Sequence, residues 1–161
     1  MSSLPRTVGL LALSFALLSL VACGSGPKDG DASVAEPIAI LAHQHGQQSE
    51  VSFPAVKHIT SAEQFEDLGL AGAEPAVFDT EDMVLVALGQ QNTGGHWVRI
   101  TGLQRVGDSV YVQATVNRPG EDAATTQALT QPYCIITTPK LGDVELRSDI
   151  TSVVGMDTPA E

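Results

Sequence analysis

The chain has 161 residues, with eight Lys and Arg against nineteen Asp and Glu, which gives a formal net charge of −11 at pH 7. This length accommodates one domain, and a polyanion of this kind repels phosphate, which argues against a nucleic-acid partner. Hydrophobic residues make up 43 %, enough for a packed core, whereas 4 % aromatic residues offer no platform for stacking bases.

The N-terminal segment predicts an export leader. Arg6 precedes an uncharged apolar run over residues 8–22, which is short for a bilayer span of about twenty residues. A positive start, a short apolar region and small residues near its end are typical of a secretory signal. We therefore expect residues 1–22 to be a signal peptide.

The end of this run, Leu20-Val21-Ala22-Cys23, resembles the lipobox of bacterial lipoproteins. In those proteins the leader is cut before the cysteine, which is then acylated. The resemblance implies that Cys23 carries acyl chains such as palmitate and anchors the protein in the bacterial envelope. Residue 24 is Gly, not the Asp associated with inner-membrane retention, which implies the outer membrane, at its periplasmic face or at the cell surface. A plain signal peptide that contains a cysteine is the alternative.

Residues 23–36 are expected to form the lipidated cysteine and a flexible tether, because the segment is rich in Gly, Ser, Asp and Ala. Its root-mean-square reach is about 20 Å. We expect a single domain over residues 37–155. With Cys23 consumed by lipid, Cys134 has no partner for a disulfide within that domain.

The first half of the domain shows short strands and one helix. Strands are predicted at 38–41 and at 50–59, and Pro54 makes the second an edge or bulged strand. A short helix is predicted near 61–68, with Thr60 as its N-cap and an acidic residue three positions later. The continuous apolar run over 83–88 predicts a central strand.

The second half predicts two hairpins. One turn at 91–95 leads into a strand over 96–106, and Gly107-Asp108 leads into a strand over 109–117. A long polar connection over 118–131 precedes a strand at 132–139. Weak edge strands are expected at 144–146 and 150–154. The expected fold is therefore mainly β: a mostly antiparallel sheet that forms a sandwich or partly closed barrel with one short helix.

Several segments in order resemble a known family. They are the helix segment ITSAEQF at 59–65, TGGH at 93–96, QALTQPY at 127–133, and the strand that ends Pro139-Lys140. This order resembles the PrcB family, whose C-terminal domain is named for an accessory subunit of a bacterial surface protease complex. The similarity covers residues 83–140 well and 37–82 more loosely. It implies an exported, β-rich binding or assembly module with a protease complex as its partner, and no catalytic mechanism.

The turn after the central strand is the candidate partner-binding segment. It consists of Asn92, Thr93, Gly94, Gly95, His96 and Trp97. One interpretation is a tight turn in which glycines supply positive φ. The other is an exposed recognition edge, because Trp97 is the only tryptophan of the chain and tryptophans dominate many interfaces. The PrcB family usually carries Tyr where this chain has His96.

The other histidines, the cysteine and the adjacent carboxylates do not predict a metal site or a catalytic site. His43 and His45 would share one face of an extended segment, but two ligands are too few for a metal site. His58 is expected to be exposed, and Cys134 lies in an apolar strand as an inert thiol. The adjacent carboxylates at 81–82 would point to opposite sides and form a poor acid–base pair. We expect no catalytic residue, no metal and no cofactor.

These observations favour a non-enzymatic envelope lipoprotein that binds a protein partner. The alternative is a peptidase inhibitor of the chagasin type. Those inhibitors insert a loop of N-x-T-G type followed by an aromatic residue, which 92–97 resembles distantly, and Arg118-Pro119 would supply a second loop. The spacing departs from that family, so the inhibitor ranks second and an enzyme third.

Overall fold

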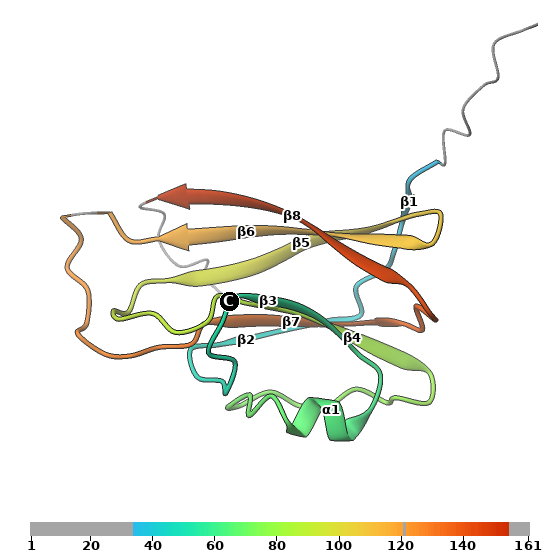
Figure 1. The fold of residues 1–161 in the computed structure, drawn as a ribbon, viewed down its shortest axis with the longest axis horizontal. Coiled ribbons are helices and arrows are strands. Elements are labelled where there is room, and N and C mark those ends of the chain that lie inside the picture. Colours follow the sequence, from blue (N-terminus) through green and yellow to red (C-terminus); the bar gives the residue numbers. More distant parts are fainter. Residues whose placement is uncertain (1–33, 121, 155–161) are drawn as a thin grey trace, which may run out of the picture. The chain divides into compact units, whose positions relative to one another are not determined.

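The computed structural model describes residues 34–120 and 122–154, so the predicted leader, Cys23 and the tether up to residue 33 lie outside the described residues. The described part contains eight strands and one helix (Figure 1). Their bounds are β1 Glu36–Pro37, β2 Ala42–Gly46, β3 Ala55–Ile59, α1 Ala62–Glu66, β4 Glu81–Ala87, β5 Trp97–Val106, β6 Ser109–Arg118, β7 Tyr133–Pro139 and β8 Glu145–Val154. No helix within these residues is long and apolar enough to span a bilayer.

The strands form two open sheets. Sheet A has the order β1-β5-β6-β8, and sheet B has the order β2-β7-β4-β3. Every pair is antiparallel except β6 with β8, which run parallel. Figure 1 shows the two sheets stacked, with α1 on the far side of sheet B. Because both sheets end in unpaired edges, the fold is a sandwich and not a closed barrel, which confirms the mainly β prediction.

Sheet B is buried on both of its faces. Val84 and Val86 of β4 pack into the core between the two sheets. Met83 and Leu85 pack on the opposite face, in a second core that includes Phe65 of α1. Alternate side chains of a strand point to opposite faces, so a strand with two buried faces is apolar at every position. This explains the continuous run at 83–88 and confirms that β4 is a central strand, between β7 and β3.

The helix is shorter than predicted and has a different cap. Ser61 is the N-cap, and its hydroxyl accepts a hydrogen bond from the Gln64 amide at 3.3 Å. The prediction of Thr60 was wrong by one residue. Thr60 precedes the cap, and its amide donates to Oε1 of Gln64 at 2.9 Å. The pair Ser61 and Gln64 therefore satisfies two backbone donors in the manner of a capping box.

The segment between β4 and β5 is not a hairpin, which corrects the sequence-based prediction. The two strands belong to different sheets, so the chain crosses the sandwich over 88–96. Gln91 instead exchanges backbone hydrogen bonds with Thr130 at 2.7 and 3.0 Å, and the Gly94 amide donates to the Thr126 carbonyl at 2.9 Å. Of the two adjacent glycines, only Gly95 has a positive φ, of 83°. A local turn pattern could not reveal that the partner is a distant connection.

Three other elements differ from the prediction. Residues 38–41 cross between the sheets: Ile38 donates to the Leu103 carbonyl of sheet A, and Leu41 donates to the Thr137 carbonyl of sheet B. The strand expected over 50–59 starts only after Pro54, although β3 is the edge strand that this proline predicted. The two weak strands near the C-terminus form one continuous strand, β8. The hairpin at Gly107 between β5 and β6 is confirmed.

Cys134 is buried between the sheets and carries a free thiol. Burial raises the pKa of the thiol, and the Ile100 amide donates to its Sγ at 3.4 Å. A buried thiol that resists ionisation is a poor nucleophile.

We therefore predict that a maleimide labels Cys134 at least about tenfold more slowly in the native chain than in denaturant, because labelling requires local opening. Mass spectrometry of the peptide that contains Cys134 measures both rates. Equal rates in the two conditions would show that the thiol is accessible in the native fold.

Candidate functional site

The sandwich has a cleft on the side where its two sheets end in β3 and β8. The cleft has a volume of about 670 Å³. Its walls come from β3 and β4 of sheet B, from β6 and β8 of sheet A, and from the crossing segment after β4. A volume of this size is typical of a binding site for a small molecule or for a few side chains of a partner.

Most of the cleft wall is apolar. The aliphatic side chains that line it include Val56 of β3, Val86 of β4, Val116 of β6 and Ile150 of β8. Ile150 remains 43 % exposed, and Phe53, which immediately precedes the lining residue Pro54, is 80 % exposed. Exposed apolar side chains beside an apolar cleft are typical of a site that a partner covers.

The polar lining residues include His96 and Arg118. Burial lowers the pKa of His96, and the positive charge of Arg118 lowers it further. The imidazole is therefore neutral at pH 7. None of the described lining residues is acidic, although the chain contains nineteen acidic residues. The described wall of the cleft thus lacks carboxylates in a strongly anionic protein.

The six predicted partner-binding residues do not share one environment. Asn92 and Gly95 are exposed, whereas Thr93 and His96 are half-buried. Gly94 and Trp97 are buried, and Trp97 is only 8 % exposed. Of the six, only His96 lines the cleft.

The buried indole shifts the balance between the two interpretations of Trp97. Its Nε1 is buried and has no hydrogen-bond partner among the described residues. Side chains from other segments hydrogen-bond to the backbone just before Trp97. Asn117 Nδ2 donates to the Gly95 carbonyl at 3.1 Å, and Thr130 Oγ1 donates to the Thr93 carbonyl at 3.1 Å. This geometry favours a packing role for Trp97 over direct contact with a partner. A binding role for the loop stays a prediction.

The two histidines of β2 were candidate metal ligands. His43 and His45 are both exposed on the same side of the strand, as predicted. Burial, the charge of Arg99 and the neighbouring His45 lower the pKa of His43. A nearby guanidinium repels a cation as well as a proton. Within residues 34–120 and 122–154, no cluster of three His, Cys, Asp or Glu side chains could hold a metal ion.

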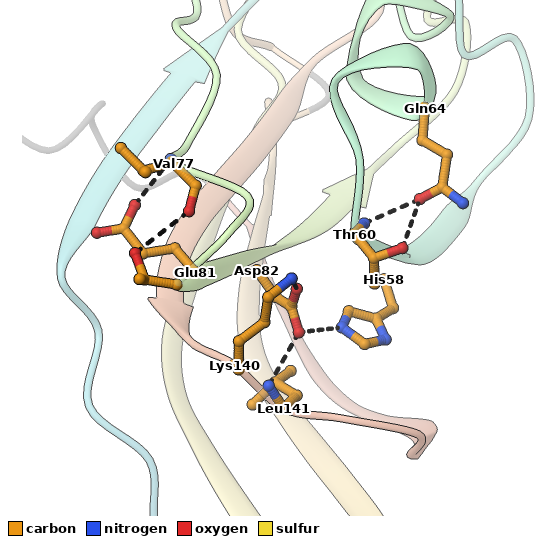
Figure 2. Close-up of polar contacts among 9 residues, drawn as sticks. His58, Thr60, Gln64, Val77, Glu81, Asp82, Lys140 and Leu141 are labelled. Carbon is orange, nitrogen blue, oxygen red and sulfur yellow. Dashed lines mark hydrogen bonds and ion pairs between the residues drawn. The ribbon is translucent and has the colours of Figure 1, made fainter.

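Asp82 is the centre of a buried polar cluster, which Figure 2 shows. Its side chain is 1 % exposed. Lys140 Nζ donates to one carboxylate oxygen at 2.8 Å. The Leu141 amide and His58 Nε2 donate to the other oxygen at 2.9 and 3.0 Å. The cluster joins the start of β4 to β3 and to the chain that follows β7.

The electrostatics of this cluster stabilise the ionised form of Asp82. Burial by itself would raise the pKa of Asp82, but the hydrogen bonds from Lys140, Leu141 and His58 outweigh it and hold the pKa below its ordinary value. A carboxylate with three donors stays ionised, because each donor favours the charged form. In the described structure, the hydrogen bond found for the His58 side chain is the one to Asp82.

Sequence reasoning missed this cluster. His58 was expected to be exposed, and that was wrong: its side chain is 16 % exposed. Glu81 and Asp82 do separate as predicted, since Glu81 Oε2 accepts from the Val77 amide at 3.1 Å (Figure 2). The sequence did contain a signal for this ion pair. Asp82 lies at the start of an apolar run that is buried on both faces, and Lys140 directly follows the next apolar strand.

We predict that Asp82→Asn lowers the free energy of unfolding by about 3 kcal/mol at pH 7, because it removes the charge that Lys140 and His58 face. The folded pKa of Asp82 is lowered, so its stabilisation is complete above the unfolded pKa of about 3.9 and disappears as the pH falls through the folded pKa. The difference between wild type and variant should therefore shrink at acid pH. Urea unfolding followed by Trp97 fluorescence measures it.

The matched control is Glu81→Gln, which changes the adjacent carboxylate but keeps an oxygen that can accept from Val77. This variant should lose less than about 1 kcal/mol. A loss from Asp82→Asn that stayed constant down to the acid range would contradict the role of its charge.

Comparison with known proteins finds a family match in the middle of the chain. The family model described as PrcB C-terminal matches residues 83–139, which comprise nearly all of β4 and the whole of β5, β6 and β7. No curated protein and no solved structure matches the chain. The match includes Val86, His96, Val116 and Arg118 of the cleft. This match over residues 83–139 confirms the resemblance to the PrcB family that the sequence motifs indicated.

Proposed function

We propose that this protein is a non-enzymatic lipoprotein of the bacterial envelope that binds a protein partner and is accessory to a surface or periplasmic protease complex. The family match supports association with a protease complex. The cleft between β3 and β8 is the observation that carries the binding role. It is open, largely apolar and flanked by two sheet edges.

The envelope location rests on the N-terminal segment. The apolar run over 8–22 after Arg6 and the sequence LVAC at 20–23 support export and acylation of Cys23. More than one acyl chain gives stable anchoring, since each buried methylene contributes about 0.8 kcal/mol. Gly24 after the cysteine supports the outer membrane. The anchored domain would then meet its partner close to the membrane surface.

We predict that Cys23→Ser gives an unprocessed precursor without lipid mass, because cleavage and acylation both require the cysteine. Intact-mass spectrometry of the wild-type and variant chains tests this. A wild-type chain that is cut at another bond and carries a free thiol at Cys23 would contradict the lipoprotein assignment.

One observation keeps a peptidase inhibitor as the second candidate. The loop 92–97 and Arg118-Pro119 lie at the same end of the sandwich, where a Cβ added to Gly95 would come within 3.5 Å of the Pro119 ring. Two adjacent loops at one end are what an inhibitor of this kind needs. Inhibition of a papain-like peptidase by the purified chain would favour this candidate, and lack of inhibition would favour the accessory subunit.

We predict that Ile150→Asp lowers recovery of a protease partner at least about fivefold, because it places a charge at the rim of the apolar cleft. The measurement is affinity capture of the anchored chain from detergent-solubilised membranes of its source bacterium, with the protease quantified by mass spectrometry. Thermal unfolding of the variant separates lost binding from lost folding.

Val77→Asp is the matched control, because Val77 is 63 % exposed and does not line the cleft. It should recover the protease as well as wild type does. Equal recovery with both variants would remove the cleft from the binding role. Absence of any protease from the wild-type sample would contradict the association itself.

A further inference from the structure

The cleft has the features of a site for an extended peptide. β3 pairs only with β4, and β8 pairs only with β6, so each has one unpaired side among the described strands. These two edge strands flank the opening of the cleft. An extended peptide can hydrogen-bond to such an edge while its alternate side chains enter an adjoining pocket. A cleft of about 670 Å³ can hold a few side chains of such a segment.

The charge of the cleft points to the chemistry of the peptide. Arg118 is exposed, and no carboxylate forms an ion pair with it in the part of the chain that the structure describes. Two other arginines do have hydrogen-bond partners: Arg105 donates to the Leu141 carbonyl, and Arg147 donates to the Glu145 carboxylate. An arginine without such a partner, next to a wall whose described residues include no carboxylate, is complementary to a carboxylate. The planar guanidinium can bind a carboxylate through two parallel hydrogen bonds.

His96 adds a second donor or acceptor at the same site. Its ring Nε2 lies 3.4 Å from Thr93 Oγ1, and its backbone carbonyl accepts from Gln47 Nε2 at 3.1 Å, so the residue is held in place. It is half-buried beside Arg118, and both residues line the cleft. A bound carboxylate would therefore meet a fixed imidazole as well as a guanidinium.

We propose that the cleft binds an extended segment of the partner protein that places an aliphatic side chain between β3 and β8 and an Asp or Glu carboxylate on Arg118. This rests on the proposed function, since it names what the partner presents to the same site. The aliphatic wall of Val56, Val116 and Ile150 selects the apolar side chain. The described lining, which lacks carboxylates, and Arg118 select the carboxylate.

Selection from a random heptapeptide phage library tests the chemistry. The bait is the whole chain, purified in non-ionic detergent and immobilised. We expect the selected peptides to be enriched in an aliphatic residue close to an Asp or Glu and depleted in Lys and Arg. Selected peptides without acidic enrichment, or no peptides that compete for one site, would overturn the proposal.

The selected consensus peptide then localises the carboxylate. Its acidic form should bind Arg118→Gln about tenfold more weakly than wild type, while its amide form, with Gln or Asn at that position, should bind both proteins alike. Arg99→Gln is the matched control, because Arg99 is exposed on β5 and does not line the cleft. Equal losses in Arg118→Gln and Arg99→Gln would show a general charge effect and overturn the site.

The two proposals can fail separately. Loss of the protease in Ile150→Asp together with peptides that need no carboxylate would leave the partner-binding function and remove the acidic-peptide inference. Conversely, a carboxylate-dependent peptide that binds at Arg118, with protease recovery unchanged in Ile150→Asp, would keep the peptide site and remove its role in the protease complex.

Discussion

The burial of sheet B on both faces is the constraint on which the rest of the fold depends. In β4 every residue from Asp82 to Ala87 is buried, and in β7 every residue from Tyr133 to Thr138. Each aliphatic side chain buried there contributes about 1.5–3 kcal/mol, so the two strands provide much of the driving force for folding. Sheet A must cover one face of sheet B, and α1 with its flanking loops must cover the other. These strands have no free face for a partner, whereas β5 and β6 of sheet A keep exposed or half-buried residues on their outer face.

The same burial explains which elements the sequence could predict. An apolar run at 83–88 and the alternation from Val110 to Val116 are local signals, and both strands formed as expected. The turn at Gly107 is also local, because the two strands that it joins pair with each other. The segment 91–95 has an equally good turn composition, yet its hydrogen bonds go to residues 126–130, which no local pattern encodes.

In the candidate site, too, the sequence predicted local features but not contacts between distant residues. His96 was in the predicted segment, but the cleft that it lines requires β3, β6 and β8 to be placed around it. The contacts of Asp82 do not follow from a local pattern, because its donors come from two separate segments, His58 and Lys140-Leu141, and Lys140 is 58 residues away. Trp97 was expected at a recognition edge because of its residue type. Its burial depends on how the chain packs around it, and side-chain type alone does not report that.

The family match covers the inner strands of the sandwich but not the strands that flank the cleft. Residues 83–139 contain the inner strands of both sheets and the side chains of His96 and Arg118. The two strands that flank the cleft, β3 and β8, lie outside the matched segment. The inner strands and the polar end of the cleft thus lie within the matched segment, whereas the flanking edge strands lie on either side of it.

The parallel strand β8 has a consequence for the order in which the chain can fold. It pairs with β6 through partners that lie thirty-six residues apart in the sequence, from Ser109 with Glu145 to Arg118 with Val154. A chain emerging from a ribosome presents β6 long before β8. During that interval the ten-residue edge of β6 is open to pairing with other chains, as edge strands are. This edge closes only when the last strand has been synthesised and pairs with it.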